Sequence, residues 1–409
     1  MTARLLITAI CALSFSAVVS NRALEDWPQW RGPARDGKSI EKGLLKAWPQ
    51  GGPKLAWRAP GAGEGYSSFA VAGGKVFTMG ARGDTEFLMA FDEATGRKVW
   101  EVAHGRRFSN DRGDGPRGTP TIDGSYVYAY GASGDLGAYD AASGRSTWKI
   151  NVLREFRGGN ITWGLSESPL VLRDRILVNA GGPNASIVAI NKKDGSVLWR
   201  SQSDGAGYSS AILHEFGGIP QAIFFSDSRA LGVDSRDGRL LWSYARVSNQ
   251  TANIATPIAR GDKVFVSSDY GTGAALLQLT ASGKTINARE VYFTRDMRNH
   301  HASSVLVGEH LYGFSSNILT AMTFDTGEVA WRDRSIGKGS VIFADDRLYL
   351  FSENGVVGLA EANPAGYREH GRFQIQTGSL PTWSHPVVAN GKLYIRDQDT
   401  IYAYNVRAN

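Results

Sequence analysis

The stretch that decides the fold is Ala90-Phe91-Asp92-Glu93-Ala94-Thr95-Gly96-Arg97-Lys98-Val99-Trp100. Shorter copies of it end at four later tryptophans, Trp148, Trp199, Trp242 and Trp331. The successive spacings are 48, 51, 43 and 89 residues, and the long last gap holds a degenerate copy around Leu279 and Gly283. Repeats of 40 to 50 residues, each with room for about four short strands, predict a β-propeller.

Each copy follows one physical pattern. A short apolar strand ends at Asp or Asn, whose side chain favours a turn by bonding to its own backbone. A Gly in the turn takes the positive φ angle that other residues avoid. The next strand then carries the Trp back, where we expect it to pack against the neighbouring unit. The pattern therefore predicts repeated hairpins that dock on one another.

A second position recurs in every unit, upstream of the turn: a Ser, Thr or His that is often followed by Pro. We call this residue the anchor of the unit. It occurs at Ser68, Thr119, Ser168, Ser210, Thr256, Ser304, Ser340 and His385. The gaps between these anchors average about 45 residues, which is the spacing of propeller blades. The anchors predict eight blades.

The two ends of the chain predict how the ring closes. The last unit stops at residues 403–406, where a strand bearing Trp should follow. The first strand, residues 54–57, ends in Trp57 and has no preceding partner. We therefore expect the N-terminal strand to complete the last blade, which pairs two edges that would otherwise be exposed. The predicted fold is an all-β, eight-bladed propeller.

The N-terminus resembles an export signal. Arg4 precedes an apolar run over residues 5–19, and residues 18–20 form a small-residue cleavage site. A retained N-terminal anchor is the alternative. No later run is apolar over about 20 residues, so no membrane span is expected in the mature chain. We divide the chain into a signal peptide (1–20), an N-terminal strap (21–52) and a single propeller (53–409), and expect a secreted or periplasmic protein.

Cysteine content and charge exclude several functions. Cys11, in the signal segment, is the chain's one cysteine, so a mature chain would lack disulfides, thiol catalysis, Cys-rich metal sites and covalent haem. The net charge is +6 and the basic residues are scattered, so nucleic-acid binding is not expected. We expect a monomer whose partner is a protein, a glycan or a small molecule.

The repeat resembles the tryptophan-docking motif of dehydrogenases that use pyrroloquinoline quinone (PQQ), within the quinoprotein alcohol dehydrogenase-like superfamily. It also resembles the propeller lipoprotein of the outer-membrane barrel assembly machinery. More narrowly, the chain is similar to secreted bacterial PQQ-binding-like β-propeller repeat proteins. The segments that carry this similarity are residues 26–33, 299–301 and 381–386. The resemblance implies quinoprotein-type blades but does not fix the function.

The residues just before the anchors predict a site at one mouth of the central channel. The first strand of each blade lines the channel of a propeller, so side chains that precede the anchors should gather there. They are polar, aromatic or ionisable: Tyr66, Arg117, Glu167, Tyr208, Asn253, His300, His301, Lys338, Trp383 and His385. We interpret this rim as a polar binding site for a small ligand, and a merely solvated channel mouth is the alternative.

The quinoprotein resemblance implies roles for several of these residues. PQQ with Ca²⁺ needs a stacking ring, cations for its carboxylates and oxygen ligands for the metal. Trp163 or Trp383 would stack, and Arg117 with Lys338 would pair with the carboxylates. Glu167 and Asn253 would hold Ca²⁺, and His300 or His301 would be the catalytic base. Two departures stand against this assignment. The adjacent Cys-Cys pair of the similar dehydrogenases is missing, and Gly271-Thr272-Gly273 is followed by Ala274 where those enzymes tend to carry Gly-Thr-Gly-Asn near the metal.

The histidines do not predict a metal centre. Adjacent residues of a strand point to opposite faces, so we expect only one of His300 and His301 to face the channel. His385 lies two blades away, and the zinc-ligand spacings are not found. Three functions remain: an exported binding or interaction propeller, a PQQ- and Ca²⁺-dependent oxidoreductase of an alcohol or sugar, and a non-redox hydrolase or lyase that uses these histidines.

Overall fold

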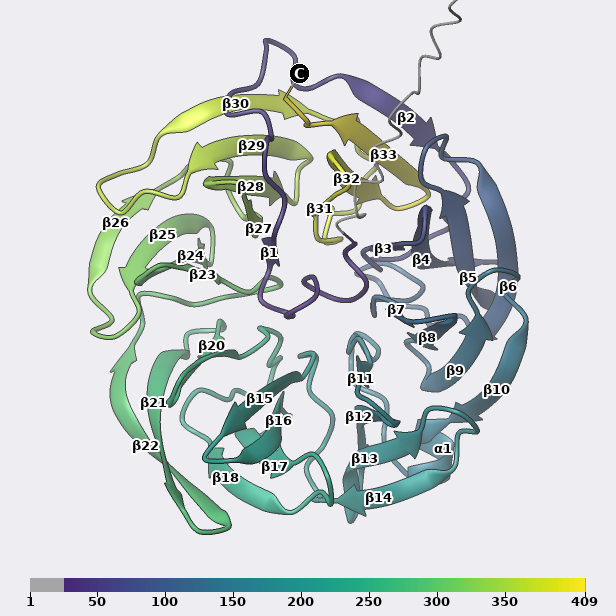
Figure 1. Ribbon diagram of the computed structural model, residues 1–409, viewed down its shortest axis with the longest axis vertical. Coiled ribbons are helices and arrows are strands. Elements are labelled where there is room, and N and C mark those ends of the chain that lie inside the picture. Colours follow the sequence, from purple (N-terminus) through teal and green to yellow (C-terminus); the bar gives the residue numbers. More distant parts are fainter. Residues whose placement is uncertain (1–25, 409) are drawn as a thin grey trace, which may run out of the picture.

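The structure is a computed structural model that describes residues 26–408, so the expected signal peptide lies outside the described residues. Eight antiparallel sheets stand around a central axis as the blades of a propeller (Figure 1). A single short helix, α1 (Val152–Phe156), interrupts the described β structure. No helix within residues 26–408 is long and apolar enough to span a membrane.

Each blade runs from an innermost strand at the channel to an outermost strand at the rim. Blade 1 comprises β3 (Ala70–Ala72), β4 (Lys75–Arg82), β5 (Thr85–Asp92) and β6 (Lys98–Arg106), and blade 2 comprises β7 (Thr121–Asp123), β8 (Tyr126–Tyr130), β9 (Asp135–Asp140) and β10 (Ser146–Asn151). Blade 3 comprises β11 (Leu170–Val171), β12 (Arg175–Gly182), β13 (Ala185–Asn191) and β14 (Val197–Ser201), and blade 4 comprises β15 (Ile212–Phe216), β16 (Ile219–Phe225), β17 (Ala230–Asp234) and β18 (Leu240–Tyr244). Blade 5 comprises β19 (Ile258–Arg260), β20 (Lys263–Ser268), β21 (Gly273–Ser282) and β22 (Thr285–Thr294), and blade 6 comprises β23 (Val305–Val307), β24 (His310–Ser315), β25 (Ile318–Thr323) and β26 (Val329–Asp333). Blade 7 comprises β27 (Gly339–Ala344), β28 (Arg347–Ser352), β29 (Val356–Glu361) and β30 (Glu369–Gln374), and blade 8 comprises β31 (Val387–Ala389), β32 (Lys392–Asp397), β33 (Thr400–Asn405) and β2 (Leu55–Ala59). The eight-bladed fold predicted from the anchors is confirmed.

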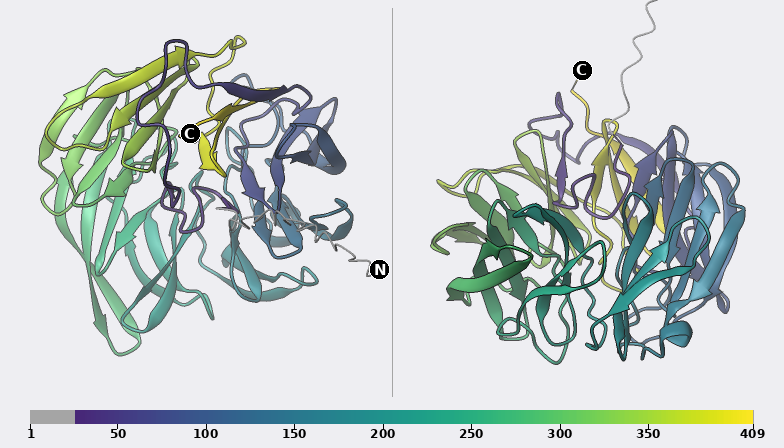
Figure 2. Two further views of the ribbon diagram at one scale, coloured as in Figure 1. Left: turned by 45° about the horizontal axis from the view of Figure 1, so that its top comes forward. Right: turned by 60° about the horizontal axis from the view of Figure 1, so that its bottom comes forward.

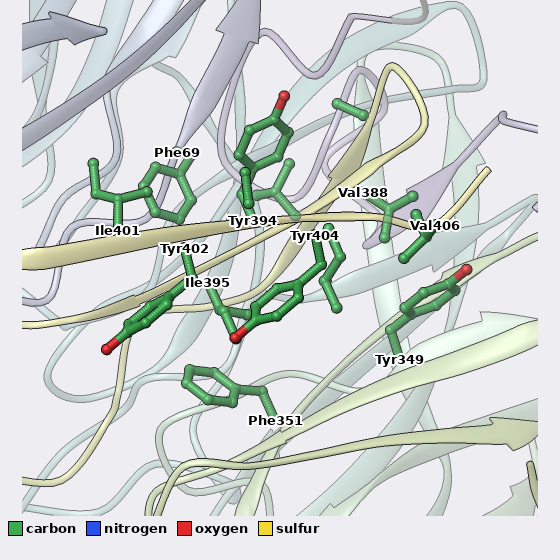
Figure 3. Packing of buried hydrophobic residues seen from close by; sticks show 14 of the residues in the cluster. Phe69, Tyr349, Phe351, Val388, Tyr394, Ile395, Ile401, Tyr402, Tyr404 and Val406 are labelled. Carbon is green, nitrogen blue, oxygen red and sulfur yellow. The ribbon is translucent and has the colours of Figure 1, made fainter. Parts of the chain in front are cut away.

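The ring closes as predicted. Strand β2 pairs antiparallel with β33, with Trp57 opposite Ala403, and becomes the outer strand of blade 8. Buried side chains from blades 7, 8 and 1 form one cluster at this seam, where Phe69 of blade 1 and Phe351 of blade 7 flank Ile395 and Tyr394 of blade 8 (Figure 3). Because apolar burial contributes about 25 cal/mol per Å², this shared core stabilises the closed ring.

Five tryptophans dock their blades on the next one, whereas the indole of Trp242 donates to Gln221 within its own blade 4. The indole N–H groups of Trp57, Trp100, Trp148 and Trp331 donate to the carbonyls of Glu93, Ala141, Lys192 and Asn363 in the following blades. The turn glycine of the next blade lies against the rings of Trp57, Trp100, Trp148 and Trp199. A Cβ added to Gly195 would lie 2.8 Å from Cε3 of Trp148, so this contact requires glycine.

The degenerate copy in blade 5 keeps the same geometry with a different residue. Tyr292 stands opposite Leu276 in the register that Trp100 occupies opposite Ala90. Its hydroxyl donates to the carbonyl of Phe324, and Gly327 of blade 6 packs on its ring. A tyrosine therefore replaces the docking tryptophan in this blade.

Residues 26–52 form a strap over one end of the channel (Figure 1). It bonds to blade 1 through Trp27 and Val71, and its strand β1 (Lys38–Ser39) adds parallel to β27. The Leu44–Arg407 bridge shows that the strap lies on the face where the chain's last described residues also lie (Figure 2). The strap therefore closes the channel at this face.

Two strap arginines reach into the channel wall. Arg31 donates to the carbonyls of Ser303 and Ser304 ahead of blade 6. Arg35 donates to the carbonyls of Ser168 and Pro169 ahead of blade 3. Both guanidinium groups are buried, and burial lowers the pKa of each to about 10, so both remain charged at neutral pH.

Candidate functional site

A cavity of about 490 Å³ occupies the channel on the face opposite the strap. Its walls come mainly from the loops that join the outer strand of one blade to the inner strand of the next, because these loops all end at the same face. The residues that line it are Trp30, Tyr66, Arg112, Arg117, Trp163, Ser166, Tyr208, Ser210, Thr251, Ile254, Tyr270, His300, His301, Lys338, Trp383 and His385. We call this cavity the cup.

The structure brings most of the residues singled out from the sequence into the cup. The ones that line it are Tyr66, Arg117, Trp163, Tyr208, His300, His301, Lys338, Trp383 and His385. They come from widely separated blades, and they meet because each precedes an innermost strand at the same end of the channel.

Glu167 and Asn253 are not among the residues that line the cup. Glu167 turns into the wall, where its Oε2 accepts a hydrogen bond of 2.7 Å from the backbone amide of Asn179. Asn253 lines a neighbouring polar cavity and donates to the carbonyls of Ser226 and Asp227. Both side chains bond to backbone groups of neighbouring segments, Glu167 to strand β12 and Asn253 to the β16–β17 turn, which explains why they face away from the cup.

Aromatic rings form much of the cup wall. Tyr66 and Trp383 have ring centroids 5.2 Å apart, and Trp163 and Tyr208 have theirs 5.7 Å apart. The planes of these two pairs are inclined by 43° and 42°. The wall therefore curves around the cavity and does not form one flat slot.

Three histidines meet in the cup, contrary to the expectation from strand alternation. His300 and His301 lie in the loop before β23, so the alternation of strand faces does not apply, and both line the cavity. His385 reaches the same place from blade 8, with its ring centroid 6.5 Å from that of His301. His385 belongs to a blade two positions away along the ring, and the three side chains still come together because all of them line the same central cavity.

The three histidines are neutral at pH 7. Burial lowers the pKa of each, and that of His385 falls to about 3 with the charge of Arg31 as a further cause. Both ring nitrogens of His301 and the Nδ1 atoms of His300 and His385 have no hydrogen-bond partner within the described chain. Each neutral imidazole offers one donor and one acceptor, so the cup presents both kinds of group.

Positive charge surrounds this space. Arg112, Arg117 and Lys338 line the cup, and no Asp or Glu is among its lining residues within the described chain. Lys338 has one carboxylate partner behind the wall, Glu353, with Nζ 3.3 Å from Oε2. Glu353 also accepts from the indole of Trp383 at 3.1 Å, and therefore positions both side chains.

Buried charges around the cup add to this imbalance. Arg31 lies beneath His385 and lowers its pKa, and Arg35 lies near Glu167. Burial raises the pKa of Glu167 to about 8, so this carboxyl group is largely protonated at pH 7 and does not offset the arginines. The channel therefore favours a ligand with negative charge.

Reasoning from the sequence missed Trp30, Arg112 and Tyr270. Trp30 belongs to the strap, donates from its indole to Thr256 Oγ1 at 2.9 Å and forms the floor against His385. Arg112 lies in the loop before blade 2, and Tyr270 lies in the turn between β20 and β21. The sequence rule considered only the residues just before the anchors, so it could not select residues from the strap or from other turns.

The cup fits PQQ and its calcium ion only in part. Its cations suit the carboxylates of PQQ, but its tilted rings do not form one flat slot, and the oxygen ligands that Ca²⁺ needs are not in its wall. Glu167 and Asn253 face other groups, and residues 26–408 contain no cluster of three or more His, Cys, Asp or Glu side chains arranged to hold a metal. No catalytic step through a quinone and calcium is therefore derived from these residues.

The fold and the cup define a quinoprotein-like β-propeller with a cavity in its central channel. Comparison with known families makes this assignment specific, because the family model described as outer membrane protein assembly factor BamB matches residues 84–333. The chain belongs to this family of PQQ-like repeat propellers.

Two similar proteins match this chain over most of its length. The assembly factor BamB of Yersinia pestis is 26% identical over 392 residues, which covers 88% of this chain and 91% of that protein. The BamB of Shewanella oneidensis is 24% identical over 341 residues, or 68% of this chain and 81% of that protein.

Two solved structures show the fold alone. BamB of Moraxella catarrhalis superposes with a TM-score of 0.64 at 14% identity, covering 86% of this chain and 99% of that one. The quinohemoprotein alcohol dehydrogenase of Comamonas testosteroni also has a TM-score of 0.64, at 13% identity, covering 94% of this chain and 81% of that one.

Proposed function

We propose that this chain is an exported binding propeller whose cup receives a ligand that carries negative charge. The observation that carries the proposal is the set of buried histidine nitrogens without protein partners inside a cavity lined by rings and cations. A buried polar group without a partner costs about 1–3 kcal/mol, so a ligand that bonds to these nitrogens would recover that free energy. The strap closes the floor and the other face stays open for entry.

Binding is favoured over quinone redox chemistry for a physical reason. The cup supplies stacking surfaces and cations, but the carboxylate and amide proposed for calcium satisfy backbone groups elsewhere. The hydrolase or lyase alternative would use His300 or His301 as a base, for which a neutral imidazole is suited. Measured turnover decides between binding alone and catalysis.

The relatives support a protein partner as well. Proteins similar to this chain are named outer membrane protein assembly factors, and a propeller offers broad loop surfaces on which another protein can dock. The apolar N-terminal segment supports export to the periplasm or secretion. In this proposal the cup is the ligand site and the blade loops are the docking surface.

The test is a calorimetric titration of the full chain with PQQ, with and without Ca²⁺. We expect binding of PQQ that is weak and independent of Ca²⁺, because the cup provides cations but no calcium ligands. Tight binding that requires Ca²⁺, together with dye-linked oxidation of an alcohol or sugar, would replace the binding proposal by the oxidoreductase. Turnover of a substrate without a quinone that is lost in His300→Ala at an unchanged melting temperature would replace it by the hydrolase or lyase.

A further inference from the structure

We propose that the ligand of the cup is a carboxylated sugar, of the uronic acid type, at the end of or within an oligosaccharide. This inference deepens the proposed function and rests on it. It depends on three features of the cup that a ligand must match together: tilted rings, a lining with three cations and no carboxylate among the described residues, and neutral histidines.

The rings favour a sugar over a flat molecule. The neighbouring rings of His301 and Trp383 are inclined by 31°, and those of Trp30 and His385 by 59°. A fused planar ligand stacks best between parallel rings, whereas a sugar ring presents separate C–H faces that can pack on rings at different inclinations. A curved aromatic wall therefore suits a chain of sugar rings.

The histidines favour hydroxyl groups. The nitrogens of His301 and the Nδ1 atoms of His300 and His385 include both donors and acceptors, because a neutral imidazole has one of each. A ligand that only accepts hydrogen bonds, such as a simple polycarboxylate, leaves the acceptor nitrogens unsatisfied. A hydroxyl group donates and accepts, so a polyhydroxylated ligand satisfies both.

The cations favour a carboxylate on that sugar. Lys338, Arg112 and Arg117 line the cup, whose described lining contains no Asp or Glu side chain, and the carboxylate partner of Lys338, Glu353, lies behind the wall. Arg117 is held in place by the carbonyls of Gly113 and Gly115, and its guanidinium lies over the ring of Tyr66, 5.5 Å from the centroid. A carboxylate on the sugar would place a negative charge against these three cations, which a neutral sugar cannot do.

Lys338 and Glu353 allow the charge preference to be changed in both directions. Lys338→Met removes a cup cation and keeps most of the side-chain volume. Glu353→Gln removes the carboxylate 3.3 Å from Lys338 Nζ and keeps an oxygen that can accept from the Trp383 indole. The first change should weaken binding of an acidic sugar, and the second should strengthen it.

The experiment measures binding of trigalacturonate and of the neutral galactose trisaccharide by tryptophan fluorescence of the full chain. We expect the acidic sugar to bind at least about tenfold more tightly, as one charge-assisted contact of the usual strength implies, and this preference to fall with added salt. Lys338→Met should reduce the preference several-fold and Glu353→Gln should increase it, while Lys284→Met, on the exposed β21–β22 turn, should leave it unchanged. Triglutamate serves as the acidic peptide without hydroxyl groups.

The outcomes separate this inference from the proposed function. Equal affinity for the acidic and neutral sugars, or tighter binding of triglutamate, overturns the uronic acid assignment while the cup remains a ligand site. If PQQ binds and neither sugar does, the uronic acid assignment is likewise wrong and the cup remains a ligand site. If none of these probes binds and the protein retains a partner in pulldown through its loops, both the sugar assignment and the ligand role of the cup are wrong.

Discussion

The strap arginine Arg31 provides a direct test of how the channel is closed. We expect Arg31→Met to destabilise the protein and to loosen the strap, because methionine keeps the apolar stem and removes all the donors. The guanidinium is 3% exposed and bonds to the carbonyls of Ser303, Ser304 and Asp36 at 3.3, 2.6 and 3.0 Å. The substitution leaves these carbonyls without that donor.

The expected magnitude follows from these contacts. A hydrogen bond to a charged group contributes about 1.5–3 kcal/mol, so three such bonds contribute about 5–9 kcal/mol. Burial of the charge opposes this stabilisation. The fall of the pKa of Arg31 from 12.5 to about 10 corresponds to an unfavourable free energy of about 3 kcal/mol. We therefore expect Arg31→Met to lower the free energy of unfolding by about 2–6 kcal/mol.

The assay is urea unfolding followed by tryptophan fluorescence, combined with limited proteolysis within residues 26–52. Arg31→Lys should have an intermediate effect, because an ammonium group keeps the charge but cannot reproduce the planar fork of donors. Arg289→Met, at an exposed position on β22, is the matched control and should change stability by less than about 0.5 kcal/mol. An Arg31→Met protein as stable as the control, with a protease-resistant strap, would refute the role assigned to this arginine.

Three other predictions test the blades and the buried ionisable groups. Trp148→Ala should lower the free energy of unfolding by about 3–5 kcal/mol, and Trp148→Phe by about 1 kcal/mol through the lost bond to Lys192; chemical denaturation measures both, and a neutral Trp148→Ala would contradict the blade docking. Burial lowers the pKa of His385 from 6.5 to about 3, so the folded state binds fewer protons than the unfolded state. The free energy of unfolding should therefore drop by roughly 2 kcal/mol as the pH falls from 6.5 to 5. His385→Gln should reduce the fall in melting temperature over this pH range. Glu167 has the opposite effect on the pH dependence of stability. Burial raises its pKa from 4.5 to about 8, so it lowers the free energy of unfolding increasingly as the pH rises from 4.5 to 8. Glu167→Gln should gain stability relative to the wild type by up to roughly 3 kcal/mol at pH 7, whereas an equal difference at pH 4 and pH 8 would show that its ionisation does not matter.

The sequence by itself determined the ring. A turn glycine four residues before each tryptophan from Trp100 to Trp331 requires a hairpin at each copy, and the unpaired strand around Trp57 requires a partner at the other end of the chain. These are local consequences of backbone conformation and strand pairing, so spacing along the chain was enough to predict eight blades and their closure. Tyr292 was hidden from the motif, but its blade was found from the anchor spacing.

The contents of the cup needed the tertiary structure. Whether a side chain before an anchor faces the cavity depends on which buried backbone groups it must satisfy, and Glu167 bonds to the amide of Asn179 for that reason. His301 and His385 meet across the channel although 84 residues separate them, and Trp30 joins them from the strap. Sequence spacing describes neighbours along the chain, whereas these residues meet because eight blades and a strap converge on one axis.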